Sequence, residues 1–397
     1  MTTTAGGRVA RPARILPVII VSQFAGTALW FAGNAVFADL QRDWALGAAA
    51  LGHLTSAVQL GFITGTLVFA VLTIADRFSP RAVFLLCSLA GALANAAIAV
   101  VAHYEALLLL RFATGFFLAG IYPVGMRIAA GWYRDGLGNA IGWLVAALVL
   151  GTAFPHLLAG LDARLPWQAV AVSVSLLSAA GGVLMYALVP DGPALSSGGR
   201  FDPAAIAAIF RSERFRASAF GYFGHMWELY AFWAFVPIAL AAHAGLHGVA
   251  LNVSLWSFAV IAAGSVGSGF GGLASLRAGS ARVAFAQLGA SGACCLASPL
   301  AFVAPTPVFL AFLLFWGIVV VGDSPQFSAL NAQNAPKTLV GSALTIANCI
   351  GFAITIVSIQ LLSWLSGIVS ARWLFVVLAL GPLAGLFAMS PLLPRRN

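Results

Sequence analysis

Charged side chains are scarce in this sequence. They make up 8% of the 397 residues, whereas a soluble domain is about one quarter charged. Hydrophobic residues reach 61%, and the mean hydropathy is +0.98. A chain with so little polar surface cannot cover itself in water, which excludes an ordinary soluble protein. The composition predicts a membrane protein with several spans, and 42 glycines fit close helix packing in lipid.

Cysteine is also rare, and all four cysteines lie inside apolar runs: Cys87, Cys294, Cys295 and Cys349. Their spacing fits neither a disulfide framework nor a metal site. The adjacent Cys294 and Cys295 are therefore interpreted as small apolar packing residues. We expect no metal and no cofactor.

The net charge of +9 does not indicate nucleic-acid binding, because the basic residues sit mostly in one set of loops and form no basic-aromatic patch. Arg8, Arg11 and Arg14 precede an apolar run over residues 15–38. This run exceeds the 7–15 residues of a signal-peptide core and lacks a clear cleavage site. We interpret it as the first retained span.

Twelve apolar runs have about the length of a bilayer crossing. They cover residues 15–38, 51–75, 82–102, 105–130, 138–160, 167–189, 216–241, 250–275, 283–303, 307–330, 340–364 and 371–391. The sequence thus predicts an all-α membrane protein with six helices in 1–190, a cytoplasmic linker in 191–215 and six helices in 216–397. Within the linker, FDPAAIAAIF predicts a short amphipathic helix on the membrane surface, and a flexible tether is the alternative.

The basic residues are distributed unequally between the two sides of the predicted membrane. With the N-terminus inside, only three fall in outer loops (Arg42, Arg164 and Arg372) and Arg111 falls within a span. The other sixteen of the twenty Lys and Arg residues are inside. This bias predicts a bacterial inner-membrane protein with both termini in the cytoplasm.

Two inner turns, about two hundred residues apart, look like imperfect copies of one signature. Between spans two and three, ADRFSPR carries Asp76, Arg77 and Arg81. Between spans eight and nine, GGLASLRAGSAR carries Arg277 and Arg282. Repeated six-helix halves of this kind are how many transporters are built.

These turns, the twelve spans and the central linker resemble the major facilitator superfamily over nearly the whole chain. Its loop signature is G-x-L-A-D-R-x-G-R-R. The first copy has Leu72 for the leading glycine and Ser79-Pro80 for Gly-Arg, and the second has Ser275 for the acid. The resemblance implies two pseudo-symmetric six-helix bundles that rock between two states. It also implies a gate in which Asp76 pairs with a nearby cation, and the alternative is that Asp76 only sets topology.

Span four contains Arg111, deep in an apolar run. Arg111, Gly115, Ala119 and Gly120 resemble the family's fourth-span pattern, R-x-x-x-G followed by small residues. The resemblance implies a role for Arg111 in proton coupling or in binding an anionic substrate. Because a buried arginine needs a counter-charge or a wet cavity, a purely structural ion pair is the alternative.

Span seven contains His225 and Glu228, which lie three residues apart and so share a helical face with Tyr222. A carboxylate at that depth costs about 2.5–3.5 kcal/mol on insertion scales. We interpret the pair as a titratable proton site, with a structural hydrogen bond between helices as the alternative. A metal site is disfavoured, because no third ligand is nearby.

Span ten contains Asp323 shortly before Pro325, which should break the helix and free carbonyls. Asp323 is the second acidic candidate, and the alternative is a structural pair with Arg127. The position of Arg127 near the inner end is itself explained by snorkelling.

Polar stripes in spans one and eleven, including Asn34 and Asn348, either hold helices together or contact solute. His156 in span five is interpreted as a satisfied interior histidine.

In the family that this chain resembles, spans one, four, seven and ten line the central cavity. Arg111, Glu228 and Asp323 fall on three of those four spans. If Arg111 pairs with one of the two acids, the other acid stays free. A proton-coupled cycle needs such a carboxyl group, because it must lose and regain a proton. We therefore predict a monomeric secondary transporter, in contact with membrane lipid, that carries protons and a small solute, in particular an organic anion.

Several alternatives remain open at this point. A multidrug exporter would use aromatic residues such as Trp30, Trp227 and Trp233. Nitrate-type carriers of this family bind their anion with arginines in spans two and eight. Those spans contain no arginine here, so a nitrate-type carrier is disfavoured. A non-transporting membrane receptor would need no buried ionisable residues. An enzyme is not expected, since no nucleophile–base–acid pattern is recognisable.

Overall fold

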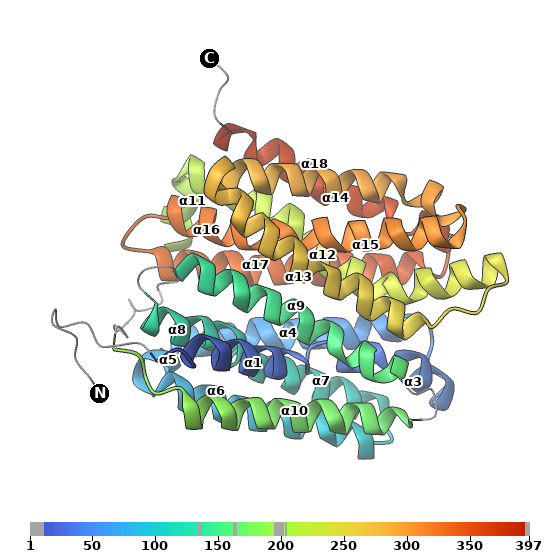
Figure 1. The fold of residues 1–397 in the computed structure, drawn as a ribbon, viewed down its shortest axis with the longest axis horizontal. Helices are drawn as coiled ribbons and strands as arrows, with labels where there is room; N and C mark the ends of the chain where they lie inside the picture. Colours follow the sequence, from blue (N-terminus) through green and yellow to red (C-terminus); the bar gives the residue numbers. More distant parts are fainter. Residues whose placement is uncertain (1–11, 134–136, 162–164, 194–201, 203–204, 394–397) are drawn as a thin grey trace.

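The computed structural model describes residues 12–133, 137–161, 165–193, 202 and 205–393, and over these residues it contains helices and no strand (Figure 1). Eleven segments are long and apolar enough to cross a membrane: Ala50–Val71, Pro80–Val100, Tyr104–Trp132, Leu137–Leu161, Trp167–Leu188, Glu213–His247, Val253–Ala278, Ser280–Phe302, Thr306–Asn334, Val340–Leu365 and Ala371–Leu392. The apolar helix Ile15–Thr27 is shorter. The predicted all-α membrane fold is confirmed.

The first predicted span is not one continuous helix. Helix α1 (Ile15–Thr27) ends early, a turn follows, and the chain continues as α2 (Ala32–Ala35) and α3 (Phe37–Asp43). The expectation of an unbroken helix over 15–38 is therefore wrong, although the apolar run itself lies where it was placed. No proline marks this break, and its physical cause lies in the side chain of Arg111, described below.

Two other spans are also interrupted near their middle. In the fourth, α7 (Tyr104–Leu118) is followed by α8 (Tyr122–Trp132), and in the tenth, α15 (Thr306–Gly322) is followed by α16 (Ser324–Asn334). Pro123 and Pro325 stand in the first turn of α8 and α16, where a missing N–H costs no hydrogen bond. The break predicted from Pro325 is confirmed.

The remaining long helices are unbroken. They are α4 (Ala50–Val71), α6 (Pro80–Ala97), α9 (Leu137–Leu161), α10 (Trp167–Leu188), α12 (Glu213–His247), α13 (Val253–Ala278), α14 (Ser280–Phe302) and α17 (Val340–Leu365). The last span is made of short 3-10 turns and α18 (Leu380–Met389). Helix α12 carries His225 and Glu228 and is the longest of them, at 35 residues.

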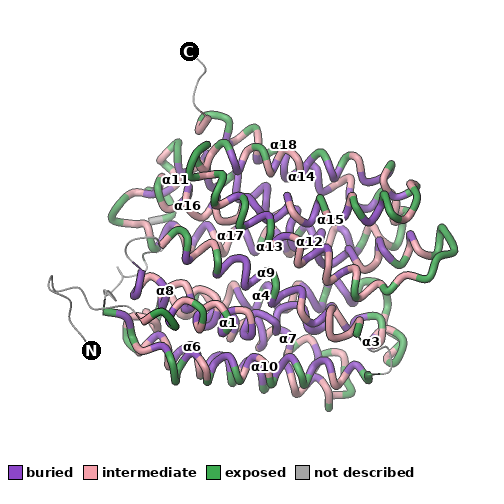
Figure 2. The backbone as a smooth tube through the Cα atoms, viewed as in Figure 1, coloured by how far each residue is buried: buried purple, intermediate pink, exposed green. Residues whose placement is uncertain are grey.

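The helices form two groups that lie beside each other. In Figure 1 the elements from α1 to α10 fill the lower part of the view and those from α11 to α18 the upper part. We call residues 12–193 the first half and residues 205–393 the second half. The halves touch mainly where α9 packs on α13 and α4 packs on α17. Figure 2 shows buried residues on the inward sides of the helices and exposed residues toward the outer faces and the two ends.

The bundle has two ends. The terminal end, at the left of Figure 1, is where α1 and α12 begin, and the far end, at the right, carries α3 and the turn between α12 and α13. The termini were expected in the cytoplasm, and this orientation stays a prediction. Several residues used for it lie outside the described residues: Arg8, Arg11, Arg134, Arg164, Arg200, Arg395 and Arg396.

The linker predicted over 191–215 is described in part, since residues 194–201, 203 and 204 lie outside the described residues. Helix α11 (Ala205–Arg211) occupies its second portion. Ile209 of α11 is fully buried against protein, whereas Ile206 is 48% exposed. Ile209 therefore packs on protein, although an amphipathic helix on the membrane surface should turn its apolar residues toward lipid. The exact division of the chain into three parts remains a prediction.

Glycines bring two pairs of helices into backbone contact. A Cβ atom built on Gly115 of α7 would lie 2.0 Å from the Val58 carbonyl oxygen of α4, and one on Gly61 would lie 2.0 Å from the Phe112 carbonyl oxygen. The second half repeats this arrangement between α13 and α15, where Gly267 and Gly317 meet the backbone of the facing helix. Only a residue without a side chain permits such an approach.

We predict that Gly115→Ala lowers the melting temperature of the purified protein by several degrees. The added methyl group must push α4 and α7 apart, and overpacking of this kind typically costs about 1–3 kcal/mol. Gly142→Ala is the matched control, because no atom lies within 4 Å of a Cβ at that position. Equal melting temperatures for both variants, measured by thermal unfolding in detergent, would contradict this account of the packing.

Candidate functional site

Arg111 is fully buried on α7, and all of its bonded partners are neutral. One terminal nitrogen donates to the Leu29 carbonyl at 3.2 Å and to the Asn95 side-chain oxygen at 3.1 Å, and the other donates to the Trp30 carbonyl. Asn95 is itself fixed by hydrogen bonds to Ala171 and Ser175. Among the described residues no carboxylate bonds to Arg111, so the expected pairing of Arg111 with an acid is wrong.

These contacts give a physical reason for the break in the first span. A continuous helix would use the Leu29 and Trp30 carbonyls in its own ladder, and a buried guanidinium would then lack acceptors. Breaking the helix frees these two carbonyls for Arg111. The Nε atom of Arg111 has no partner among the described residues, and it lies against Gly33, where a Cβ atom would be 3.1 Å away.

His225 and Asp323 form a buried pair between α12 and the start of α16. His225 Nδ1 lies 2.8 Å from Asp323 Oδ1, and each side chain is 1% exposed. The alternative that Asp323 pairs with Arg127 is wrong, because Arg127 bonds to Asp76 instead. The contact therefore joins α12 to the tenth span through two buried ionisable side chains.

Glu228 has a separate set of partners, although it shares a helical face with His225. Its Oε1 atom accepts hydrogen bonds from the Ser291 hydroxyl, from the Trp316 indole N–H at 2.7 Å and from the Cys295 thiol at 3.3 Å. These donors come from α14 and α15, so Glu228 points into the second half rather than toward Arg111. Sequence reasoning missed all three donors, because nothing in their spacing distinguishes them from packing residues.

The two remaining predicted binding residues have polar partners on neighbouring helices. The Tyr222 hydroxyl of α12 donates to Asn348 of α17 at 2.8 Å. The Asn34 amide of α2 donates to Thr55 of α4 at 2.8 Å. In each case one member of a predicted polar stripe joins two helices of the same half.

The predicted binding groups are sealed in this structure. Arg111 is 0% exposed, and Glu228 and Asp323 are each 1% exposed. A cavity of about 480 Å³ lies at the far end beside Trp44 and Trp167, and one of about 740 Å³ lies at the terminal end beside Arg216 and Leu392. Neither reaches the three charged groups. The expectation that they face a wet cavity is therefore not met in this arrangement of the helices.

An aromatic cluster fills the middle of the contact between the halves. We use this name for Trp30, Phe31 and Phe62 of the first half with Tyr230, Trp233 and Phe352 of the second. Trp30 stacks on Phe352 with ring centroids 5.6 Å apart and lies 5.7 Å from Tyr230, while Phe31 meets Trp233 edge-on at 6.1 Å. Because Arg111 bonds to the Trp30 carbonyl, it also positions the ring that reaches across to the other half.

Polar contacts join the halves at the far end. Gln360 of α17 donates to the Ser56 hydroxyl of α4 at 2.8 Å. Asn252, at the start of α13, donates to the Gly160 carbonyl of α9 at 2.8 Å. A Cβ atom on Gly160 would lie 2.8 Å from the Leu255 backbone nitrogen. The far end is thus closed by direct backbone and side-chain contact between the halves.

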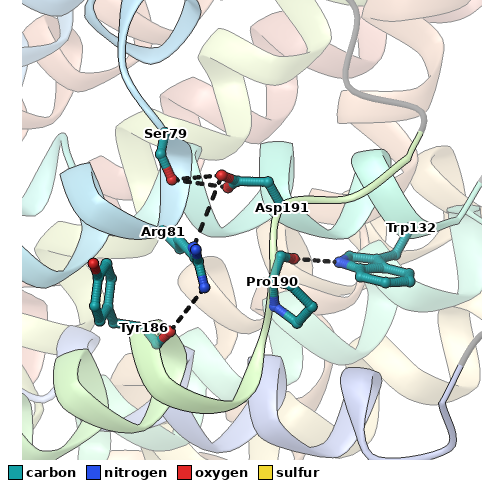
Figure 3. Close-up of polar contacts among 6 residues, drawn as sticks. All are labelled: Ser79, Arg81, Trp132, Tyr186, Pro190 and Asp191. Carbon is teal, nitrogen blue, oxygen red and sulfur yellow. Dashed lines mark hydrogen bonds and ion pairs between the residues drawn. The ribbon is translucent and has the colours of Figure 1, made fainter. Parts of the chain in front are cut away.

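The predicted gating residues of the first half lie at the terminal end. Asp76 in α5 (Ile74–Arg77) forms an ion pair with Arg127 of α8, so the predicted pairing of Asp76 with a nearby cation is present. Arg127 was expected to need no partner because its side chain could snorkel to the membrane surface, and the ion pair with Asp76 corrects this interpretation. Arg81 lies 3.8 Å from an Asp191 oxygen, and the Ser79 hydroxyl donates to the same carboxylate (Figure 3).

Asp191 is a residue that sequence reasoning missed, and it anchors the start of the linker. Arg81 also donates to the Tyr186 carbonyl, and the Trp132 indole donates to the Pro190 carbonyl at 2.9 Å (Figure 3). The remaining predicted gating residues, Arg77, Arg277 and Arg282, are exposed, and the described residues offer them no ion pair. The serine at 275 explains why the second turn lacks the contact made by Asp76.

A bundle of membrane-length helices in two halves, each with sealed charged groups, is the fold of a multi-pass membrane transporter. The family model of the Major Facilitator Superfamily matches residues 18–359. The chain belongs to the Major Facilitator Superfamily, whose members are transporters and not enzymes.

Two curated relatives match parts of the chain. The niacin transporter NiaP of Acinetobacter baylyi is 32% identical over 131 residues, which cover 30% of this chain and 29% of that protein. The putative niacin/nicotinamide transporter NiaP of Bacillus subtilis is 27% identical over 172 residues, covering 41% of this chain and 40% of that protein. The matched segments thus span less than half of either relative.

Solved structures with the same fold are much less similar in sequence. The nucleoside transporter NupG has a TM-score of 0.73 at 14% identity, covering 96% of this chain and 100% of that one. A bacterial homolog of the human lysosomal transporter Spinster, in an inward-facing and unoccupied conformation, has a TM-score of 0.70 at 14% identity, covering 96% of each chain. These likenesses show the fold alone.

We predict that Arg111→Met destabilises the protein strongly, and that Arg111→Lys restores little of the loss. The Leu29 and Trp30 carbonyls and Asn95 would each lose a donor, and a hydrogen bond to a charged group contributes about 1.5–3 kcal/mol. A lysine ammonium lacks the planar fork that reaches several acceptors at once. Thermal unfolding in detergent checks this expectation, with Arg42→Met at the exposed far end as the control. A melting temperature for Arg111→Met equal to that of the control would contradict the proposed role of Arg111 in holding the broken first span.

Proposed function

We propose that this protein is a secondary active transporter that carries a small organic anion across the bacterial inner membrane by alternating access, driven by protons. The observation that carries the proposal is Arg111, a fully buried cation whose bonded partners are all neutral. The chain is proposed to keep both termini in the cytoplasm and to act as a monomer of two halves.

The positive charge of Arg111 is the reason for proposing a negatively charged substrate. A buried cation without a bonded anion creates a positive potential around it, and in a low-dielectric interior this potential acts over several ångströms. A negatively charged solute that entered between the halves would therefore be favoured over a neutral or cationic one. The matched relatives are named for transport of niacin or nicotinamide, and niacin is an organic acid.

The proton sites are proposed to be Glu228 and the His225–Asp323 pair. Three donors converge on one oxygen of Glu228, an arrangement that suits the ionised carboxylate. Protonation would weaken these bonds, which tie α12 to α14 and α15. A proton on Glu228 or Asp323 would thus change how firmly α12 is held within the second half.

The structure supports alternating access through the unequal contacts at its two ends. The far end is joined between halves by Gln360–Ser56 and Asn252–Gly160. At the terminal end the ion pairs Asp76–Arg127 and Arg81–Asp191 lie within the first half and do not join it to the second. The gating role proposed for Asp76 and Arg81 is to hold this end of the first half rigid while the halves rock.

Uptake into proteoliposomes tests the proposal. With an acidic exterior, the wild-type protein should accumulate a labelled small organic anion, and a protonophore should abolish the accumulation. Glu228→Gln and Asp323→Asn should each lose pH-driven accumulation but keep exchange of labelled for unlabelled substrate, because exchange needs no net proton movement. Asp39→Asn at the exposed far end is the control and should behave as wild type.

Two results would contradict the proposal in different ways. Undiminished pH-driven accumulation in both Glu228→Gln and Asp323→Asn would exclude these carboxylates as the coupling groups. Accumulation of organic cations, with no organic anion carried by the wild-type protein, would exclude the substrate sign inferred from Arg111.

A further inference from the structure

Two buried N–H donors beside the aromatic cluster have no acceptor. The Trp30 indole N–H donates to the Gln59 side-chain oxygen at 3.3 Å. Because an indole nitrogen only donates, this bond fixes the orientation of the Gln59 amide and leaves its NH₂ group turned away. Among the described residues neither this NH₂ nor the Trp233 indole N–H has a hydrogen-bond partner, and both side chains are fully buried.

Such groups are costly in a membrane protein. A buried donor without an acceptor destabilises the fold, and lipid supplies no water to replace the acceptor. Buried polar groups are nearly always bonded in folded proteins. Two unpartnered donors at one contact between the halves therefore point to a ligand that supplies the acceptors in another state of the protein.

The two donors adjoin the same pair of rings from opposite halves. Gln59 lies on α4 and bonds to Trp30. Trp233 lies on α12, and its ring meets the Tyr230 ring edge-on at 5.4 Å. Trp30 and Tyr230 themselves lie 5.7 Å apart. A ligand that entered between these two rings would lie near both donors. One of these donors belongs to each half.

The chemistry of the surroundings defines the ligand class. The unpartnered groups are both donors, and the rings around them favour a flat aromatic ligand by stacking. Arg111, which bonds to the Trp30 backbone, adds positive charge behind the ring.

We infer that the transported anion is an aromatic carboxylate. Its ring is inserted between Trp30 and Tyr230, and its acceptor atoms are bonded by the Gln59 and Trp233 N–H groups. This inference rests on the proposed function and specifies its substrate class. Since one donor belongs to each half, the substrate would also draw the two halves together, and loss of either donor weakens binding.

Binding to the purified protein, followed by isothermal titration calorimetry, tests the inference. The probes are nicotinate and benzoate, which are aromatic acids, nicotinamide, which has the ring without the charge, and lactate, which has the charge without the ring. The wild-type protein should bind the two aromatic acids more tightly than either of the other probes.

Three variants separate hydrogen bonding from ring packing. Trp233→Phe keeps an aromatic ring but removes the N–H, and Gln59→Glu keeps the oxygen that accepts from Trp30 but removes the NH₂. Each should raise the Kd for nicotinate about tenfold, the effect of losing about 1.4 kcal/mol. Trp167→Phe is the matched control, because it removes an indole N–H that bonds to Asp43 at the far end, and it should keep the wild-type Kd. Melting temperatures and gel filtration establish that each variant is folded.

The outcomes distinguish this inference from the function on which it rests. Wild-type Kd values for nicotinate in both folded variants would overturn the assignment of Gln59 and Trp233. Tight binding of lactate with no binding of either aromatic acid would overturn the aromatic class and leave an organic-anion transporter standing. Binding of nicotinamide alone would overturn both, since the site would then not select a negative charge.

Discussion

The structure depends on how a guanidinium group is accommodated where hydrocarbon surrounds the helices. Lipid offers Arg111 neither water nor counter-ion, so its acceptors must come from the protein. The break after Thr27 supplies the Leu29 and Trp30 carbonyls, and Asn95 supplies a third acceptor. The same break turns Trp30 toward the second half. One buried side chain thereby fixes the path of the first span and the middle of the contact between the halves.

The second half has a different internal organisation. Its buried acids are held by neutral donors or by histidine: Glu228 by Ser291, Cys295 and Trp316, and Asp323 by His225. Arg111 thus lies in the first half and Glu228 and Asp323 lie in the second, and over the described residues these three groups do not bond to one another. Between them stands the aromatic cluster, which separates the charges and leaves the halves joined there by stacking rather than by ion pairs.

The sequence was sufficient to predict the fold and a large part of the helical order. Apolar runs mark the spans because hydrocarbon excludes polar residues over a fixed thickness, and Pro325 marks the break in the tenth span because it lacks an N–H. The break in the first span could not be predicted, since Ala28–Phe31 contains no helix breaker and its cause is a side chain eighty residues away. The partners of Glu228 were also hidden, because a serine, a cysteine and a tryptophan in apolar helices are ordinary packing residues until the fold brings them to one oxygen.

The two halves resemble each other in helix packing but differ in the charges of their inner turns. Glycines at 61 and 115 in the first half correspond in role to those at 267 and 317 in the second, because both helix pairs need backbone contact. The inner turns differ, since Asp76 pairs with Arg127 while the Ser275 hydroxyl donates to the Gly272 carbonyl of its own helix. Such asymmetry would let one half act as a rigid body at this end while the other adjusts.

If the sealed charged groups serve a transporter, its halves must part at the far end in another state. The most direct measurement is the distance distribution between spin labels introduced as unnatural amino acids at the exposed positions 48 and 367, which flank the α4–α17 contact and leave the native cysteines unchanged. A transporter of this kind should give a short-distance population that matches the closed far end and a longer one whose share changes with substrate and pH. A single short distance that is unaffected by nicotinate, other small organic anions and pH would contradict it.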